Sequence, residues 1–239
     1  MIQPLLDRLQ QFSLISPTFQ RAEATDVLAR HGVESWFLYS YDEWKKRWHV
    51  WRGLLWAINN IDHKGRILET GCGCGWNLFW LAANGFESLT GIDINTSAIA
   101  AGNELAQGAG IPVRLRSDNA LNPASLQEAP FHLLLALNWT YHVPEFALAQ
   151  FLDRYRELLI PGGVVLLDTV EKSFGTHPKS CFLTSDWSKP ESERRPSEYV
   201  HRFTLRDIRE ISASCGFRVA AYYTRWGTIP RSIYMLRRE

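Results

Sequence analysis

The residues best suited to chemistry form a glycine-rich stretch that reads Glu69-Thr-Gly-Cys-Gly-Cys-Gly75. An apolar run precedes it and a helical pattern follows, so we expect it to join a strand to a helix. Glycines at the alternate positions 71, 73 and 75 allow a tight turn and a close approach of the backbone to a ligand. The helix start behind them favours an electron-rich ligand group. The stretch therefore predicts a ligand-binding loop.

Two acidic residues occupy the positions where a nucleoside would need them. Asp93 ends the second predicted strand, where a carboxylate can accept both ribose hydroxyls. Asp118 follows the third, where a carboxylate can hold an adenine amino group. A dinucleotide-binding turn would read G-x-G-x-x-G rather than G-x-G-x-G, and Glu69 would lie badly beside a pyrophosphate. Residues 64–170 carry six basic and ten acidic residues, net −4, which suits a cationic ligand.

This combination resembles the class I S-adenosylmethionine (SAM)-dependent methyltransferases. The turn from Glu69 to Gly75 matches the family's first motif, and Leu159-Ile-Pro-Gly-Gly163 matches its turn before the fifth strand. The resemblance covers residues 64–170 strongly and 204–239 by pattern. It implies SAM as the cofactor. The cofactor-binding residues that we predict are Glu69, Gly71, Cys72, Gly73, Gly75, Asp93, Ile94, Asp118, Asn119 and Asn138.

The segment Asn138-Trp-Thr-Tyr-His142 follows the fourth predicted strand. In open α/β sheets this carboxyl end faces the ligand. The segment partly resembles the N-P-P-Y box of enzymes that methylate planar nitrogens, although Trp139 and Thr140 replace both prolines. Asn138 either accepts a hydrogen bond from an amine or caps the strand, and His142 is either a general base or structural. The catalytic candidates are Asn138, Tyr141 and His142.

Apolar runs that alternate with helical patterns predict an α/β fold. We expect a Rossmann-like, doubly wound, mostly parallel seven-stranded sheet with an antiparallel last strand, plus an N-terminal helical cap. The predicted strands cover residues 66–69, 89–94, 112–116, 131–137, 164–168, 217–223 and 231–236, and the helices cover 76–84, 97–107, 144–159 and 204–214. The expected domains are residues 1–63, a helical cap or lid, and 64–239, the SAM-binding domain with an insert at 171–203.

Five of the ten tryptophans fall within residues 36–56. Ser40 and Glu43 form a capping-box pattern, and Trp44, Trp48 and Trp51 then recur on one helix face. An earlier helix is expected over 19–31, ending near glycine 32. Most of the tryptophans are expected to pack the cap onto the sheet. The residues predicted to close over the substrate are Trp36, Tyr39, Tyr41 and Tyr199.

Composition narrows the possible settings. The 239 residues carry 26 basic and 25 acidic side chains, a net charge of +1, which argues against a strongly basic nucleic-acid-coating protein. No signal peptide or membrane span is expected. The four cysteines do not suggest a disulfide framework, and Cys72-Gly-Cys74 has no matching second pair, so we predict no metal. The expected setting is cytoplasmic, with a small-molecule substrate, no nucleic acid and no membrane. The oligomeric state stays open.

Three reactions remain open at this point. The first is methyl transfer to an N or O nucleophile of a small molecule, in secondary metabolism. The second is attack on the methionyl Cγ with release of methylthioadenosine, as in aminopropyl transfer or cyclisation to azetidine-2-carboxylate. The third is RNA methylation, for which residues 200–239 provide eight basic and three acidic residues, net +5.

Overall fold

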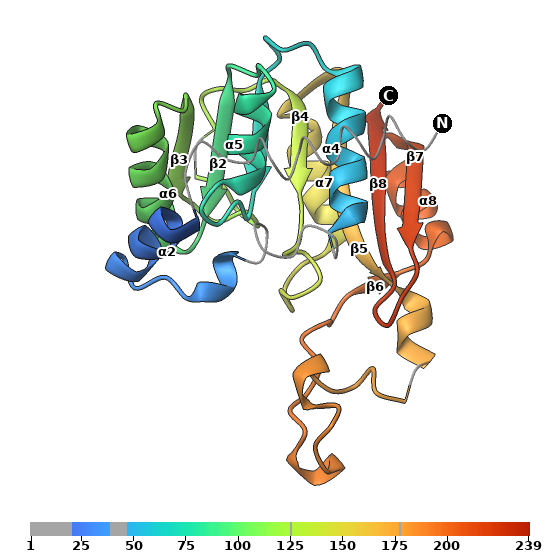
Figure 1. Cartoon of the computed structure of the whole chain (residues 1–239). Helices are drawn as coiled ribbons and strands as arrows, with labels where there is room; N and C mark the ends of the chain where they lie inside the picture. The colour runs from blue at the N-terminus through green and yellow to red at the C-terminus, as the bar shows by residue number, and fades with distance from the viewer. Residues whose placement is uncertain (1–20, 39–46, 125, 177) are drawn as a thin grey trace, which may run out of the picture.

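A computed structural model of the chain describes residues 21–38, 47–124, 126–176 and 178–239 (Figure 1). Several predictions lie outside these residues: the lid residues Tyr39 and Tyr41, the capping box of Ser40 with Glu43, and Trp44. For Trp36 the structure describes only the backbone, which lies in the 3-10 helix η1 (Ser35–Leu38).

One mixed sheet organises the molecule. Its strands are β1 (Ile67–Thr70), β2 (Leu89–Asp93), β3 (Val113–Ser117), β4 (Phe131–Ala136), β5 (Leu159–Glu171), β7 (Phe217–Arg225) and β8 (Arg231–Arg238), in the order β3-β2-β1-β4-β5-β8-β7. The short β6 (Arg202–Phe203) pairs with the end of β5. β8 runs antiparallel to both β5 and β7, and the other strand pairs are parallel. The predicted fold class is confirmed, with the two-residue β6 as an addition.

Helices cover both faces of this sheet (Figure 1). One apolar cluster joins α2 (Arg21–Arg30), α4 (Trp48–Asn60), α5 (Trp76–Ala83) and α6 (Thr96–Ala109) to one face, and a second joins α7 (Leu148–Arg156) and α8 (Leu205–Ser214) to the other. Because strand side chains alternate between faces, Leu166 of β5 belongs to the first cluster and Leu167 to the second. The expected cap pair of Thr204 and Asp207 forms a capping box that starts α8.

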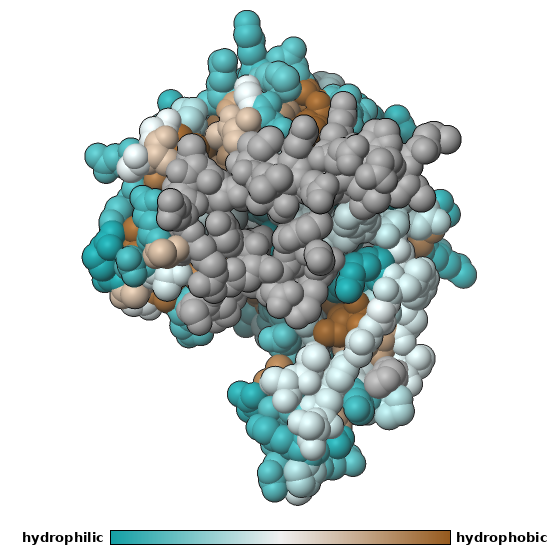
Figure 2. All heavy atoms as spheres, viewed as in Figure 1, coloured by the Kyte–Doolittle hydropathy of each residue, from teal (hydrophilic) through white to brown (hydrophobic). Residues whose placement is uncertain are grey.

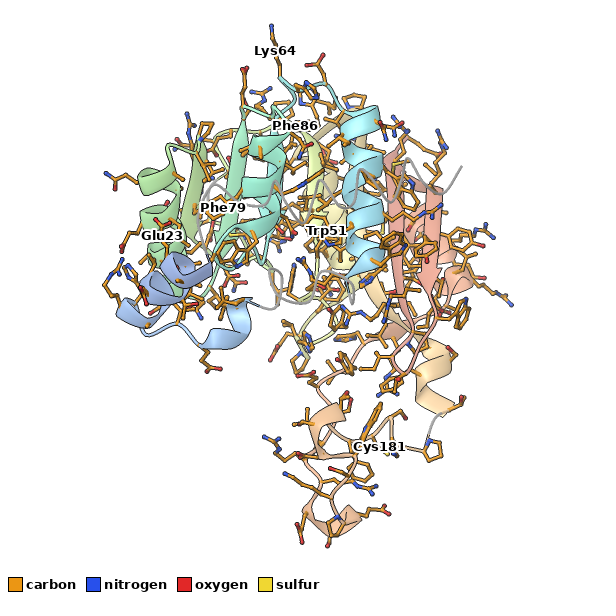
Figure 3. The ribbon with its side chains drawn as sticks, in the orientation of Figure 1. Glu23, Trp51, Lys64, Phe79, Phe86 and Cys181 are labelled. Atoms are coloured by element: carbon orange, nitrogen blue, oxygen red, sulfur yellow. The ribbon has the colours of Figure 1, made fainter. Side chains whose placement is uncertain are left out.

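Helix α4 packs directly on the sheet. A Cβ added at Gly53 would lie 2.7 Å from the side chain of Ile233 in β8, so the helix backbone approaches this strand closely. Trp51 is 5% exposed and meets Trp80 of α5 edge to face, with ring centroids 5.8 Å apart. Figure 3 shows Trp51 and Phe79 inside the body of the protein. The division into residues 1–63 and 64–239 stays a prediction.

Two element boundaries differ from the expectation. The helix predicted over 144–159 is shorter, because the N–H of Phe146 donates to the carbonyl of Val143 in a turn and α7 begins only at Leu148. The predicted turn at 161–163 is a local irregularity within the longer strand β5. Gly162 has a φ of +74° there, and the pairing with β4 shifts register.

The insert between β5 and α8 forms an arm that projects from the carboxyl-terminal edge of the sheet (Figure 1). It contains η2 (Lys172–Thr176), η3 (Thr184–Asp186) and η4 (Glu191–Glu193), and its surface is mainly hydrophilic or neutral (Figure 2). Asp186 accepts from Arg195 at 2.7 Å and contacts Lys189 at 2.9 Å, so ion pairs of its own hold the arm together. Among the described residues, no helix is long and apolar enough to cross a bilayer.

Candidate active site

The glycine turn lies where β1 passes into α5. Gly71, Gly73 and Gly75 have φ values of +63°, +54° and +88°, in the left-handed region that favours glycine. The N–H of Gly73 donates to Oδ2 of Asp93 at 2.7 Å, and the N–H of Asn95 donates to Oδ1 at 2.8 Å. Asp93 thus ties the turn to the end of β2. Each carboxylate oxygen still has a lone pair for a ligand.

Two aromatic rings flank this turn. A Cβ added at Gly71 would lie 2.4 Å from the ring of Trp139, which follows β4. One added at Gly73 would lie 3.1 Å from Phe37 of η1. A larger residue at either position would collide with these rings. The glycines therefore let the backbone pass close to these two rings where β1 and β4 end.

Glu69 is a buried carboxyl group beneath the turn. It is 1% exposed, and its Oε1 accepts from Nδ2 of Asn77 at 2.5 Å. Its Oε2 is buried and has no hydrogen-bond partner among the described residues. Burial raises the pKa of Glu69 to about 8, although the Asn77 bond and the positive charge of Arg47 oppose the rise. A cationic ligand group would supply the missing partner and favour the carboxylate.

The remaining cofactor candidates occupy the ends of β2 and β3. Ile94, directly after β2, is 75% exposed and offers an apolar face. Asp118 accepts from the N–H groups of Asn119 and Ala124, so it already organises the turn after β3. Oδ1 of Asn119 accepts from Leu121 in the same turn. The side chains of Asp118 and Asn119 thus make hydrogen bonds to the backbone of their own turn, beside the site.

The C-x-C cysteines are interior packing residues. Cys72 and Cys74 are both buried, and a Cβ added at Gly91 of β2 would lie 2.8 Å from Sγ of Cys72. Burial raises the pKa of Cys72 well above its usual value and that of Cys74 to about 12. The described residues contain no group of three or more His, Cys, Asp or Glu side chains that could hold a metal ion.

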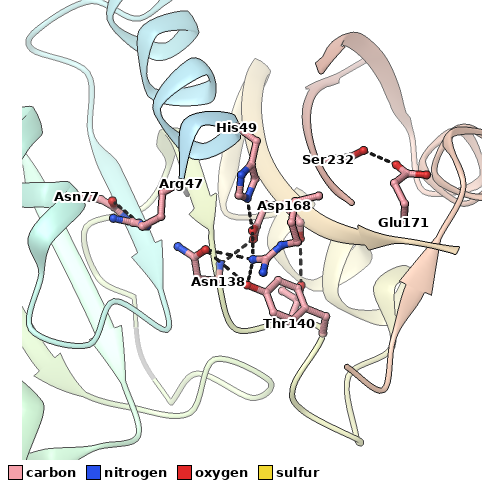
Figure 4. Close-up of polar contacts among 10 residues, drawn as sticks. Arg47, His49, Asn77, Asn138, Thr140, Asp168, Glu171 and Ser232 are labelled. Carbon is pink, nitrogen blue, oxygen red and sulfur yellow. Dashed lines mark hydrogen bonds and ion pairs between the residues drawn. The ribbon is translucent and has the colours of Figure 1, made fainter. Parts of the chain in front are cut away.

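Asn138 lies directly after β4. It begins the segment 138–142, which we call the acceptor end of the site because the catalytic candidates lie there. Its φ is +64°, the only positive value among the described non-glycine residues. Such backbone strain is typical of functional sites. Its N–H donates to Oδ1 of Asp168 at 2.7 Å, and its side-chain oxygen accepts from Arg231 at 3.3 Å (Figure 4). The oxygen that we expected to hold an amine thus already has a donor.

Asp168 is the centre of a buried polar cluster that sequence reasoning missed. Its side chain is fully buried near the end of β5, and its Oδ2 lies 3.2 Å from Nε2 of His49 in α4 and 2.9 Å from the guanidinium of Arg231 in β8. Burial raises the pKa of Asp168 to about 7. The adjacent Arg231 favours the ionised carboxylate. An acid inside an apolar strand was the only sequence signal, since its partners lie 119 and 63 residues away.

Aromatic residues form the outer wall of this end. The rings of Tyr141 and His142 lie 5.7 Å and 5.3 Å from that of Tyr199, which returns from the arm. The N–H of Val200 donates to the carbonyl of Tyr141 at 2.9 Å, and Nδ1 of His142 lies 3.2 Å from the carbonyl oxygen of Glu198. Burial lowers the pKa of His142. The structure thus brings together the predicted Tyr141, His142 and Tyr199.

A comparison with known protein families finds one match, which covers the glycine turn and most of the parallel strands. Residues 67–163 match the family described as "Methyltransferase domain". These residues contain a methyltransferase domain, and its fold is that of solved SAM-dependent methyltransferases. The match contains Glu69, the glycine turn, Asp93 and the segment from Asn138 to His142.

Relatives of the methyltransferase domain include enzymes with different substrates. The chain is 26% identical over 159 residues to a ubiquinone biosynthesis O-methyltransferase of Psychrobacter arcticus, covering 64% of this chain and 58% of that protein. It is 23% identical over 132 residues to a tRNA U34 carboxymethyltransferase of Idiomarina loihiensis, covering 54% and 39%. The chain thus spans less than two thirds of the length of either relative.

A solved structure extends the similarity to nearly the whole chain. Magnesium protoporphyrin IX methyltransferase from Synechocystis, with bound SAH, aligns with a TM-score of 0.65 at 16% identity and covers 91% of this chain and 95% of that one. At this identity the likeness concerns the fold of the methyltransferase domain and its surroundings.

Proposed function

We propose that this protein is a SAM-dependent methyltransferase that acts on an N or O nucleophile of a small molecule. The observation that carries the proposal is the buried Glu69 beneath the glycine turn, because its Oε2 has no partner among the described residues. Such a group suits the ammonium of SAM. Asp93 at the end of β2 would hold the ribose hydroxyls, and the exposed Ile94 would contact the adenine.

When bound, SAM supplies a methyl group already activated on a cationic sulfur. The protein therefore needs mainly to bind and orient the acceptor and to exclude water. The aromatic wall of Tyr141, His142 and Tyr199 supports a planar or apolar acceptor. The ring of Trp139 can stabilise positive charge beside the ends of β1 and β4, whereas the ring of Tyr141 already has the guanidinium of Arg231 over it, 4.1 Å from its centroid.

The arm and the N-terminal helices are the parts that would define the acceptor. Tyr199 from the arm and Phe37 from η1 reach the site from outside the matched residues 67–163. Elements added around a shared domain are where substrate choice is usually encoded. We propose further that the reaction belongs to secondary metabolism and takes place in the cytoplasm. We propose that Trp36, Tyr39 and Tyr41 complete the cover.

The proposal is tested by identifying the nucleoside product. We expect purified protein to bind SAM and, with a panel of phenols, carboxylic acids and amines, to release S-adenosylhomocysteine and a methylated acceptor detected by mass spectrometry. Methylthioadenosine formed from SAM alone would replace the proposal with attack on the methionyl Cγ. Methylation of tRNA or rRNA, with none of any small molecule, would replace it with RNA methylation. Absence of SAM binding would overturn all three.

The variant Asp93→Ala tests the proposed position of the SAM ribose. The substitution removes the carboxylate that would hold the ribose and also releases the N–H of Gly73. We expect SAM affinity to fall at least tenfold in calorimetry, as for a lost charge-assisted bond of about 1.5–3 kcal/mol. Asp62→Ala, in the exposed loop before β1, is the control and should leave it unchanged. Equal affinities for the two variants would contradict the placement of the ribose.

A further inference from the structure

His49 is a buried titratable group for which the proposed function has so far given no role. It lies in the first turn of α4, is 2% exposed, and points toward Asp168 of β5 (Figure 4). Asp168 in turn accepts from the N–H of Asn138, the residue that follows β4. Two hydrogen bonds therefore connect His49 with the point where β4 ends beside the glycine turn. In open α/β sheets ligands bind at this edge.

The contacts of His49 assign a role to each ring nitrogen. Nε2 lies 3.2 Å from Oδ2 of Asp168. Arg231, 2.9 Å from the same oxygen, favours the ionised carboxylate, which can only accept. Above the Asp168 pKa of about 7 the carboxylate is ionised, so Nε2 must carry the hydrogen and Nδ1 keeps its lone pair. Nδ1 is buried and has no partner among the described residues, which is an unusual state for a polar atom.

The surrounding charges keep this ring neutral. Burial is the main cause that lowers the pKa of His49 well below 6.5, and the positive charges of Arg231, Arg47 and Arg225 lower it further. They approach from β8, from the start of α4 and from β7, while Asp168 is the acidic partner. At neutral pH the imidazole is thus in the form that can accept a proton. Asp168 can stabilise the imidazolium that results.

We propose that His49, oriented by Asp168, is the general base that accepts the proton of a hydroxyl acceptor through Nδ1. The inference rests on the proposed function and deepens it. A neutral amine can attack before it loses a proton, whereas a hydroxyl becomes a strong nucleophile only when its proton leaves. The acceptor oxygen forms the new O–CH3 bond as the S–CH3 bond breaks with its electrons on sulfur. The hydroxyl proton moves to Nδ1 and later to water.

A structural role for the His49–Asp168 pair, pinning α4 to the sheet, makes a different prediction. In that case either ring nitrogen, or both, can carry hydrogen, and the ring needs no free lone pair. The base role requires a free lone pair on Nδ1, which can be measured in the free protein without any cofactor or acceptor, and the kinetics of a variant then separate the two roles. Nitrogen NMR of histidine-labelled protein measures the tautomer directly, with His49→Gln used to assign one of seven histidines.

We expect His49 to be neutral from pH 8 down to below 6.5, its unperturbed value, and to carry its hydrogen on Nε2 at pH 8, where the carboxyl of Asp168 is ionised. An imidazolium at neutral pH, or a hydrogen on Nδ1 at pH 8, would overturn the proposal. The tautomer is measured on the wild-type protein, and His49→Gln serves only to assign the signal. If His49→Gln folds poorly, the histidine signal that shifts in Asp168→Asn provides the assignment instead. Failure to bind SAM would contradict the proposed function separately.

Kinetics provide the second measurement. With the hydroxyl compound that the wild type methylates, His49→Gln should lower kcat about 10²–10⁴-fold, with SAM affinity within about twofold. The residual rate should rise steeply with pH, as the acceptor loses its proton to water. His63→Gln, in the exposed loop after α4, is the control. A wild type that methylates only amines, or a variant with the wild-type rate and pH profile, would overturn the proposal.

Discussion

At the scale of single residues, the site places two buried carboxyl groups in contrasting surroundings. Asp168 accepts from Asn138 and is paired with Arg231 and His49. Glu69 has one bonded oxygen, and its other oxygen has no partner among the described residues. The first carboxyl is satisfied by the protein. The second remains partly unsatisfied and suits a cationic ligand.

Glu69 predicts a pH dependence of SAM binding. Its pKa of about 8 in the free protein means that the carboxyl holds its proton at pH 7. A cationic ligand favours the carboxylate, so binding at pH 7 should release nearly one proton. Affinity should rise as the pH increases toward 8, by up to about tenfold per unit. Calorimetry in buffers of different ionisation enthalpy measures the proton release.

Glu69→Gln should abolish this proton release and lower the affinity. Glu87→Gln, an exposed position before β2, should retain both. Wild-type binding without proton release would contradict the placement of Glu69. The same shift affects folding, because the unfolded chain loses this proton near 4.5. Between pH 4.5 and 8 the contribution of Glu69 to the free energy of unfolding should therefore decrease as the pH rises.

Gly71 predicts a loss of stability together with a loss of binding. Gly71→Ala places a side chain in the left-handed region, at a cost of about 1–2 kcal/mol, and against the ring of Trp139. That ring also packs on Phe146 and Phe151 and cannot easily move. We expect urea unfolding to show a destabilisation of at least about 2 kcal/mol.

Gly108→Ala is the matched control for this change. Gly108 lies in α6, and nothing is within 4 Å of an added Cβ. The substitution should raise the free energy of unfolding by about 0.5–1 kcal/mol. If Gly71→Ala did not lower the free energy of unfolding either, the close approach between the turn and Trp139 would not restrict the residue at position 71.

At the scale of elements, the arm is joined to the acceptor end of the site. The backbone at Val200 bonds to Tyr141, and Phe174 and Tyr199 form a small apolar cluster with that residue. A separate set of ion pairs around Asp186 holds the outer part of the arm. The inner part of the arm can therefore position the acceptor wall.

Tyr199→Ala tests this connection. Removing the ring withdraws support from Tyr141 and His142 but leaves the glycine turn intact. We expect the KM for the acceptor to rise at least severalfold, while the Kd for SAM stays within twofold. Steady-state kinetics and calorimetry measure the two constants. Val200→Ala, a side chain that is 49% exposed, is the control. A change in SAM affinity alone would show that the arm serves the cofactor instead.

At the scale of the whole molecule, helix α4 connects the N-terminal segment with the sheet. It contributes Trp51, Leu54 and Leu55 to the same buried cluster as β5 and β8, and His49 to the site. Its position on the sheet therefore bears both on stability and on the proposed proton transfer.

Trp51→Ala should reveal whether α4 unfolds together with the sheet. Loss of this buried ring should cost about 3–5 kcal/mol in one cooperative transition seen by circular dichroism and fluorescence. Trp226→Ala, 70% exposed, should change stability by less than about 0.5 kcal/mol. An early separate transition in the wild type would indicate that the N-terminal helices form an independent unit, as the predicted division at 63 allows.

The sequence by itself determined most of the elements and the glycine turn. Strands, helices, the capping box of Thr204 and the glycines at 71, 73 and 75 follow from local periodicity and backbone preference. The ends of β1, β2 and β4 then meet because parallel strands share one edge. Asn138, Tyr141 and Asp93 were thus recognisable in advance as residues of this edge.

Only the tertiary structure decided which groups face one another there. His49, Asp168 and Arg231 come from three elements, and their sequence separations of 119 and 63 residues leave no local pattern. The state of a buried acid depends on which neighbours desolvate and pair it, which is a property of packing. For the same reason, the sequence favoured His142 as the base, while the folded chain places His49 against Asp168.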